Sequence, residues 1–111
     1  MAEISEHFLI EGKHRTFRIV AGGFTFYVIG HFLAEISSFF DAAFFGDFAE
    51  AREKVVTLQT DSAEDVAVFL EVVHPGERKK ITERNCAIMM RYSDIWDISS
   101  LRTECTDYLH A

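Results

Sequence analysis

The five histidines and two cysteines are the side chains whose chemistry could make this chain an enzyme or a metal protein. Imidazole and thiolate groups act as general bases, nucleophiles and zinc ligands when a fold brings several of them together. The spacings that indicate such sites are missing, because the sequence has no HExxH, CxxC or GxSxG string. We therefore expect no catalytic residue, no metal site and no cofactor, and we expect that the chain is not an enzyme.

The two cysteines are better explained as core side chains. Cys86 and Cys105 each fall in an apolar, helix-like register, and their separation is not a metal-ligand spacing. A disulfide between them is the less favoured alternative, because proteins of reducing compartments keep their thiols free. We expect the chain in the cytoplasm, with the nucleus as the alternative.

Charge and hydropathy exclude two classes of partner. Eleven Lys and Arg residues stand against eighteen Asp and Glu residues, which gives a net charge of -7. Such a charge repels phosphate backbones and anionic lipid headgroups. The apolar runs are shorter than the roughly 20 residues of a membrane-spanning helix, and the basic triplet Arg78-Lys79-Lys80 is expected to be a solvated loop. We expect neither nucleic acid nor membrane as a partner.

Aromatic side chains are the feature that points to protein binding. The chain has eleven phenylalanines, and they cluster between Phe17 and Phe48. This is more than a core of this size needs, so we expect some of them on a surface that meets another protein. Trp96 is expected at the edge of the core, with an anchoring role for a partner as the alternative.

The elements that position these residues begin with strands. Residues 17–29 predict a β-hairpin, because Gly22-Gly23 separates two aromatic and β-branched runs. Residues 31–45 have helical periodicity with a break at Ser37-Ser38, where a serine hydroxyl can cap a second helix that Gly46 ends. Residues 54–58 predict a third short strand.

The rest of the chain predicts helices. Ser62 opens a capped helix that His74-Pro75-Gly76 stops, Thr82 is expected to cap the next one, and residues 97–99 introduce the last. The pattern predicts an α+β domain over residues 16–111. Residues 1–15 are expected to be an N-terminal tail or an arm exchanged with a partner.

Several local strings follow the predicted hairpin in order. They are Phe32-Leu33-Ala34-Glu35-Ile36-Ser37-Ser38-Phe39-Phe40, Ala43-Phe44-Phe45-Gly46-Asp47-Phe48-Ala49-Glu50, Ile81-Thr82-Glu83-Arg84-Asn85 and Tyr92-Ser93-Asp94 through Leu101, Cys105 and Leu109. Together with the hairpin, these strings resemble the BTB/POZ domain family over residues 16–109. The turn Val73-His74-Pro75 departs from the family's usual aromatic-glycine pair, which indicates a divergent member similar to the BTB half of MATH-BTB adaptors. The resemblance implies a short three-stranded sheet flanked by a cluster of five or more α-helices.

The resemblance also implies a function as a protein-interaction module. Many members of the family are homodimeric adaptors that dock onto the cullin-3 scaffold of a ubiquitin ligase and bring substrates for ubiquitination. The family's cullin-binding signature is similar to Phe48-Ala49-Glu50, so Phe48 and Glu50 are the expected contacts with the N-terminal region of cullin-3. The alternative is that Phe48 folds back onto the core.

The homodimer implied by the resemblance needs an apolar interface. Thr16 and Ile29-Gly30 stand where members with a charged pocket carry charged residues, which puts a repressor role of that pocket in doubt. The expected interface consists of apolar residues of the N-terminal arm and the first helix, namely Phe8, Leu9, Ile10, Phe32, Leu33 and Ile36.

Two alternative functions follow from the same fold. One is an oligomerisation scaffold or transcription cofactor that does not bind cullin, and the other is a subunit similar to Skp-like or elongin-C-like proteins. The sequence contains no substrate-recruiting domain such as MATH or kelch repeats. We expect either that the chain is a piece of a longer adaptor or that another subunit supplies recognition.

Overall fold

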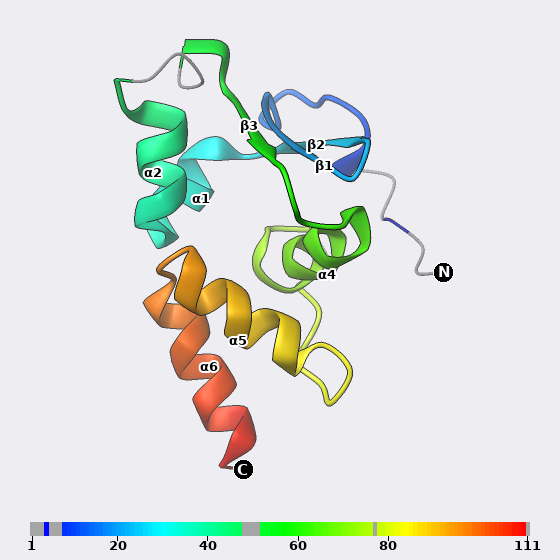
Figure 1. The fold of residues 1–111 in the computed structure, drawn as a ribbon, viewed down its shortest axis with the longest axis vertical. Helices are drawn as coiled ribbons and strands as arrows, with labels where there is room; N and C mark the ends of the chain where they lie inside the picture. Colours follow the sequence, from blue (N-terminus) through cyan, green and yellow to red (C-terminus); the bar gives the residue numbers. More distant parts are fainter. Residues whose placement is uncertain (1–3, 5–7, 48–51, 77, 111) are drawn as a thin grey trace.

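The computed structural model describes residues 4, 8–47, 52–76 and 78–110 of the chain. Among these residues a three-stranded sheet lies at one end of the molecule and the last two helices lie at the other (Figure 1). Five helices accompany the sheet in the part of the chain that the structure describes. The predicted α+β class is therefore confirmed.

The predicted hairpin is present. Strands β1 (Phe17–Ala21) and β2 (Phe24–Val28) pair in antiparallel fashion. Gly22 and Gly23 have φ angles of 55° and 81°, as a tight primed turn requires. A Cβ atom on Gly22 would lie only 2.7 Å from the backbone nitrogen of Ala63, so this glycine also permits a close approach to the next helix.

The third strand completes a mixed sheet. Strand β3 (Val55–Leu58) pairs with β1 in parallel, and the strand order is β2-β1-β3. A parallel pair needs a crossover connection, and the helices α1 (Gly30–Ile36) and α2 (Ser38–Phe45) lie in it. The sequence predicted the strand but not its partner or its direction.

The helical elbow is confirmed at Ser37, whose φ and ψ of -140° and 119° are extended. Its hydroxyl oxygen accepts a hydrogen bond from the backbone N–H of Phe40 at 3.2 Å and thereby caps α2. The same hydroxyl donates to the carbonyl oxygen of Trp96 at 2.6 Å. One buried side chain thus bends the chain and joins it to the C-terminal helices.

Helix α4 (Ala63–Val73) begins and ends where the sequence predicts. The Ser62 hydroxyl accepts a hydrogen bond from the backbone N–H of Asp65 at 3.1 Å, and His74 follows the last helical residue. Buried positions occur along the whole helix. This burial agrees with the place of α4 between the sheet and the helices α5 (Cys86–Ile95) and α6 (Ser99–Leu109) (Figure 1).

The expected cap of the next helix was wrong. Helix α5 begins at Cys86 rather than next to Thr82, and its N-cap residue is Asn85. The Asn85 carboxamide oxygen accepts from the backbone N–H of Thr82 at 2.8 Å, and its nitrogen donates to the carbonyl of Lys80 at 3.1 Å. These bonds hold residues 80–85 in a turn, so the helix starts only after it.

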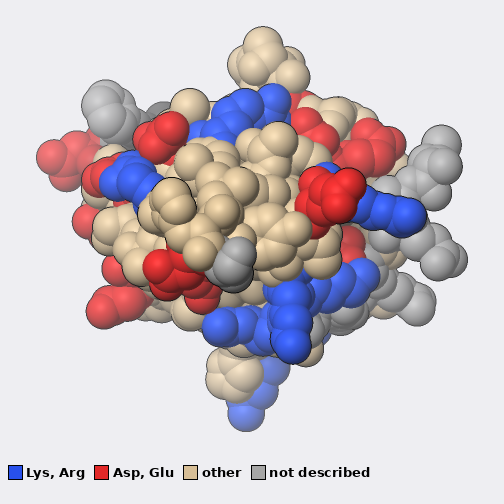
Figure 2. Space-filling view, turned by 90° about the horizontal axis from the view of Figure 1, so that it is seen from below, with Lys and Arg blue, Asp and Glu red and all other residues tan. Residues whose placement is uncertain are grey.

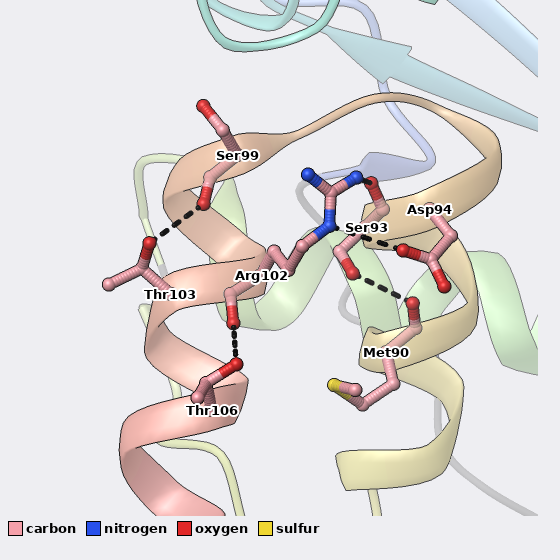
Figure 3. A network of polar contacts seen from close by, with 7 residues as sticks. All are labelled: Met90, Ser93, Asp94, Ser99, Arg102, Thr103 and Thr106. Carbon is pink, nitrogen blue, oxygen red and sulfur yellow. Dashed lines mark hydrogen bonds and ion pairs between the residues drawn. The ribbon is translucent and has the colours of Figure 1, made fainter.

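A polar network attaches α6 to α5 (Figure 3). The Arg102 guanidinium donates to the carbonyl oxygen of Ser93 at 3.0 Å and to the Asp94 carboxylate at 3.2 Å. Thr103 and Thr106 hydroxyls bond to carbonyls one turn earlier in their own helix. The guanidinium therefore bridges the two helices, while Leu101 and Cys105 of α6 are buried.

The aromatic residues divide between core and surface. Trp96 is buried, as favoured by the sequence, and its ring stacks on Tyr92 with centroids 3.9 Å apart. Phe40 and Phe69 complete this cluster with ring contacts to Trp96. Exposed aromatic rings are also present, as expected: Phe24, Phe45 and Tyr108 are 42%, 44% and 38% exposed.

Replacing Ser37 with alanine should lower the free energy of unfolding by about 2 kcal/mol, because it removes a helix cap and leaves the buried Trp96 carbonyl without this donor. Urea denaturation followed by circular dichroism measures the change. Ser38→Ala is the matched control, since its hydroxyl bonds to the Asp97 carboxylate at an exposed site, and it should cost under about 1 kcal/mol. Equal losses for the two variants would contradict the role assigned to Ser37.

Candidate protein-interaction surface

The predicted cullin contacts Phe48 and Glu50 lie outside the residues that the structure describes. The described chain before them ends α2 at Phe45, where the backbone N–H of Gly46 donates to the carbonyl of Ala42 at 2.9 Å. A Cβ atom on Gly46 would lie 2.3 Å from that carbonyl oxygen. The end of α2 is therefore fixed at a glycine, as the sequence predicts.

An aromatic surface lies at this end of α2. The Phe45 ring is 44% exposed and contacts the rings of His31 and Phe17, with centroid distances of 4.9 Å and 5.3 Å. The Lys54 ammonium lies 5.4 Å from the centroid of Phe17. An apolar ring that stays partly exposed among such neighbours is the kind of group that anchors a partner protein.

The six predicted dimer residues divide into two sets. Phe8 and Leu33 are completely buried within the chain's own core, so in this fold they offer no surface to a partner. Ile10 is 56% exposed, and Leu9, Phe32 and Ile36 are half-buried. Phe32 and Ile36 are four residues apart and share a face of α1, whereas Leu33 points to the core. The dimer interface stays a prediction, and it now depends on the partly exposed residues Leu9, Ile10, Phe32 and Ile36.

A hollow adjoins the exposed face of α1. Phe32 and Ile36 line it together with Val73 of α4 and with Leu101 and Glu104 of α6. Three helices that are distant in sequence thus contribute to one surface. Apolar side chains of all three helices line it next to the charged Arg78 and Glu104, a mixed surface on which a second copy of the chain could dock.

His74 is a residue whose role the sequence did not show. Its ring is completely buried, its Nε2 accepts from the backbone N–H of Ile29 at 2.8 Å, and its Nδ1 lies 2.9 Å from the carbonyl oxygen of Pro75. An acceptor Nε2 and a donor Nδ1 define the neutral ring. The same ring contacts Phe8 and Phe32 edge to face, at 5.1 Å and 5.8 Å between centroids. His74 therefore fixes the start of α1 against the end of α4.

The departure at Val73-His74-Pro75 was the sequence feature that could have found this role. A histidine that stands next to a proline at the end of an apolar helix has its ring near free backbone groups. Which backbone group the ring would meet could not be predicted, because Ile29 is 45 positions away along the chain.

The electrostatics of the helices indicate structural rather than catalytic groups. Burial and a 2.8 Å hydrogen bond to the Asp61 carboxylate raise the pKa of Tyr92 well above its usual range. Burial, with smaller contributions from Cys86 and Glu104, raises the pKa of the Cys105 thiol to about 11. A thiol with such a pKa is protonated near neutral pH and is a poor nucleophile. Both cysteines are free and buried, as core residues are.

The part of the chain that the structure describes has neither a metal-binding cluster nor a membrane-spanning helix. The described residues hold no group of three or more His, Cys, Asp or Glu side chains placed to bind a metal ion. None of the helices within those same residues is long and apolar enough to cross a membrane.

A three-stranded mixed sheet, a two-helix elbow and an exposed apolar face define a small α+β protein-interaction domain. The BTB/POZ domain model matches residues 6–111, and the chain belongs to this family. Membership identifies it as a protein-interaction module. The match begins before Phe8, in agreement with the burial of that residue in the core.

Curated relatives support the assignment. The chain is 36% identical over 77 residues to human Kelch-like protein 24, which covers 69% of this chain and 13% of the relative. It is 34% identical over 91 residues to BTB and MATH domain-containing protein 15 of Caenorhabditis elegans, covering 82% of this chain and 33% of the relative. Kelch-like protein 3 of Pongo abelii is 24% identical over 79 residues. The chain thus spans between about an eighth and a third of the length of these relatives.

Replacing His74 with alanine should lower the free energy of unfolding by about 3 kcal/mol, because the Ile29 N–H loses its acceptor and the rings of Phe8 and Phe32 lose a contact. Thermal unfolding followed by circular dichroism measures the loss. His14→Ala is the control, since His14 is exposed, and it should change stability by less than about 0.5 kcal/mol. A His74→Ala protein as stable as the control would overturn the assigned role.

Proposed function

We propose that this BTB/POZ domain is a homodimeric adaptor that binds the N-terminal region of cullin-3 and brings substrates to a ubiquitin ligase. The observation that carries the proposal is the exposed aromatic surface at the end of α2, where Phe45 precedes the family's cullin signature by three residues. An aromatic ring provides contact area, and the Glu50 carboxylate would orient the partner through a charge-assisted hydrogen bond.

The scaffold around this segment also supports the proposal. Helix α2 begins beside the turn between α5 and α6, where the Ser38 hydroxyl donates to the Asp97 carboxylate at 2.7 Å. Ile95, at the end of α5, is 54% exposed. Helix α2 therefore runs from the exposed Ile95 side chain, which lies beside its start, to the exposed ring of Phe45 at its end. Both side chains belong to rigid helices, which lose little conformational entropy on binding.

Homodimerisation is proposed through the exposed face of α1. Phe32 and Ile36 offer a half-buried apolar pair beside a hollow, and Ile10 adds an exposed apolar side chain from the N-terminal segment. A two-fold interface would bring the same patch of both copies together. Substrate recognition would come from another part of a longer protein or from another subunit, since the chain spans only 13% and 33% of the length of the relatives named Kelch-like protein 24 and BTB and MATH domain-containing protein 15.

The alternative, an oligomerisation scaffold or transcription cofactor without cullin binding, shares the α1 interface but not the cullin contact. The same hollow at α1 supports it. The two functions differ in what happens when Phe48 and Glu50 are changed, so one experiment separates them.

Phe48→Ala combined with Glu50→Ala should weaken binding to a cullin-3 N-terminal fragment at least about thirtyfold, the effect expected for removing interface hot spots. Isothermal titration of the purified domain measures the affinity. Phe24→Ala combined with Glu83→Ala is the control, because it removes an exposed aromatic ring and an exposed carboxylate elsewhere. Equal affinity of the wild type and both variants for the cullin-3 fragment, or no binding by the wild type, would contradict the cullin proposal and favour the oligomerisation scaffold.

Ile36→Glu should shift the domain from dimer to monomer, because it places a charge in an apolar interface. Multi-angle light scattering gives the mass, and circular dichroism checks that the variant is folded. Ile95→Glu introduces the same charge at an exposed position on another surface and should stay dimeric. A wild-type domain that is already monomeric at high concentration would refute the proposed interface.

A further inference from the structure

Arg78 of the basic triplet Arg78-Lys79-Lys80 also borders the hollow beside α1, whereas Lys79 and Lys80 take no part in the proposed cullin or dimer contacts. The triplet forms one wall of a groove between the end of α4 and the end of α6, which we call the α4–α6 groove. Val72, Ile81 and Tyr108 supply its apolar lining, and Glu104 and Asp107 of α6 form the opposite wall. The triplet is exposed, as the sequence predicts for a solvated loop, and apolar surface lies beside it.

The loop that carries the basic wall is held in place by α4. The backbone N–H of Lys79 donates to the carbonyl of Glu71 at 2.7 Å, and the Lys79 ammonium pairs with the largely buried Glu71 carboxylate. Arg78 has a φ of 49°, a left-handed conformation that is uncommon for a residue other than glycine. Residues 78–80 therefore have a defined conformation, which a partner would not have to order.

The basic wall is unusual for this chain. The net charge is -7, yet the exposed side chains of Arg78 and Lys80 form no ion pair among the residues that the structure describes. Figure 2 looks onto the end of the molecule at which α6 finishes, where basic and acidic side chains surround an uncharged centre and the largest group of basic side chains lies below it. Unpaired cations next to exposed apolar surface are complementary to a ligand that carries carboxylates and apolar groups together.

We propose that the α4–α6 groove binds an acidic amphipathic segment of another protein. Its carboxylates would pair with Arg78 and Lys80, and its apolar side chains would cover Ile81 and Tyr108, which is 38% exposed. The acidic wall of Glu104 and Asp107 repels carboxylates, so it orients the segment with its acidic side toward the loop. This site is additional to the proposed cullin contact and would bind a different partner.

The probe is a labelled helical peptide of about 16 residues with Glu on one face and Leu on the other, long enough to be helical in water, and fluorescence anisotropy measures its binding to the wild-type domain. Arg78→Glu combined with Lys80→Glu should weaken binding at least tenfold. Lys13→Glu combined with Arg52→Glu makes the same change in net charge at exposed positions outside the groove and should change it less than twofold. Binding of the wild type should weaken as salt is raised.

Three outcomes would overturn the proposal. A matched peptide with Gln in place of Glu that binds equally well would exclude charge recognition. Equal effects of the two double variants would show dependence on net charge rather than on the groove. A peptide that converts dimer to monomer in light scattering would show that a second copy occupies this surface. The Phe48→Ala and Glu50→Ala double variant should keep peptide binding, so this proposal and the cullin proposal fail independently.

Discussion

The buried hydroxyl of Ser37 is the contact on which the rest of the arrangement depends. It accepts a hydrogen bond from Phe40 and donates one to the carbonyl of Trp96, a residue 59 positions later in the chain. The first bond sets the angle between α1 and α2, and the second sets where the α5–α6 turn lies against them. Because both use the same oxygen atom, the elbow cannot change without moving the C-terminal helices.

Aromatic packing converts that single contact into a rigid domain. Trp96 lies against the rings of Tyr92, Phe69 and Phe40, which come from α5, α4 and α2. The abundance of phenylalanine therefore has mainly a structural purpose, and only a few rings remain partly exposed. The exposed ring of Phe45 is informative because the core already accounts for most of the others.

Local rules predicted the elements that local interactions determine. The Gly22-Gly23 turn, the break at Ser37 and the Ser62 cap each depend on residues within a few positions, and all three are present. The direction of β3 and the start of α5 at Cys86 depend on crossover geometry and on a side chain that competes for backbone groups. The periodicity of apolar residues does not indicate the direction of a strand or the first residue of a helix.

The candidate site could be predicted less well, for a related reason. Apolar residues that suit a dimer interface suit a core equally well, and Phe8 and Leu33 went to the core while Phe32 and Ile36 stayed partly exposed. Helical periodicity separates the faces of α1 but does not say which face the rest of the chain covers. Whether Phe48 lies on the surface is a question of the same kind, which is why binding has to decide it.

His74 shows how a departure from the family pattern can alter the interface without touching a partner. Its ring fixes Ile29 at the start of α1 and contacts Phe32, which belongs to the expected dimer surface. The position of α1 therefore depends on a neutral, hydrogen-bonded imidazole at the end of α4. A family member whose side chain at this position cannot accept the N–H of Ile29 must hold its α1 by other contacts. Pairing preferences among divergent members can then differ even where the exposed apolar residues are alike.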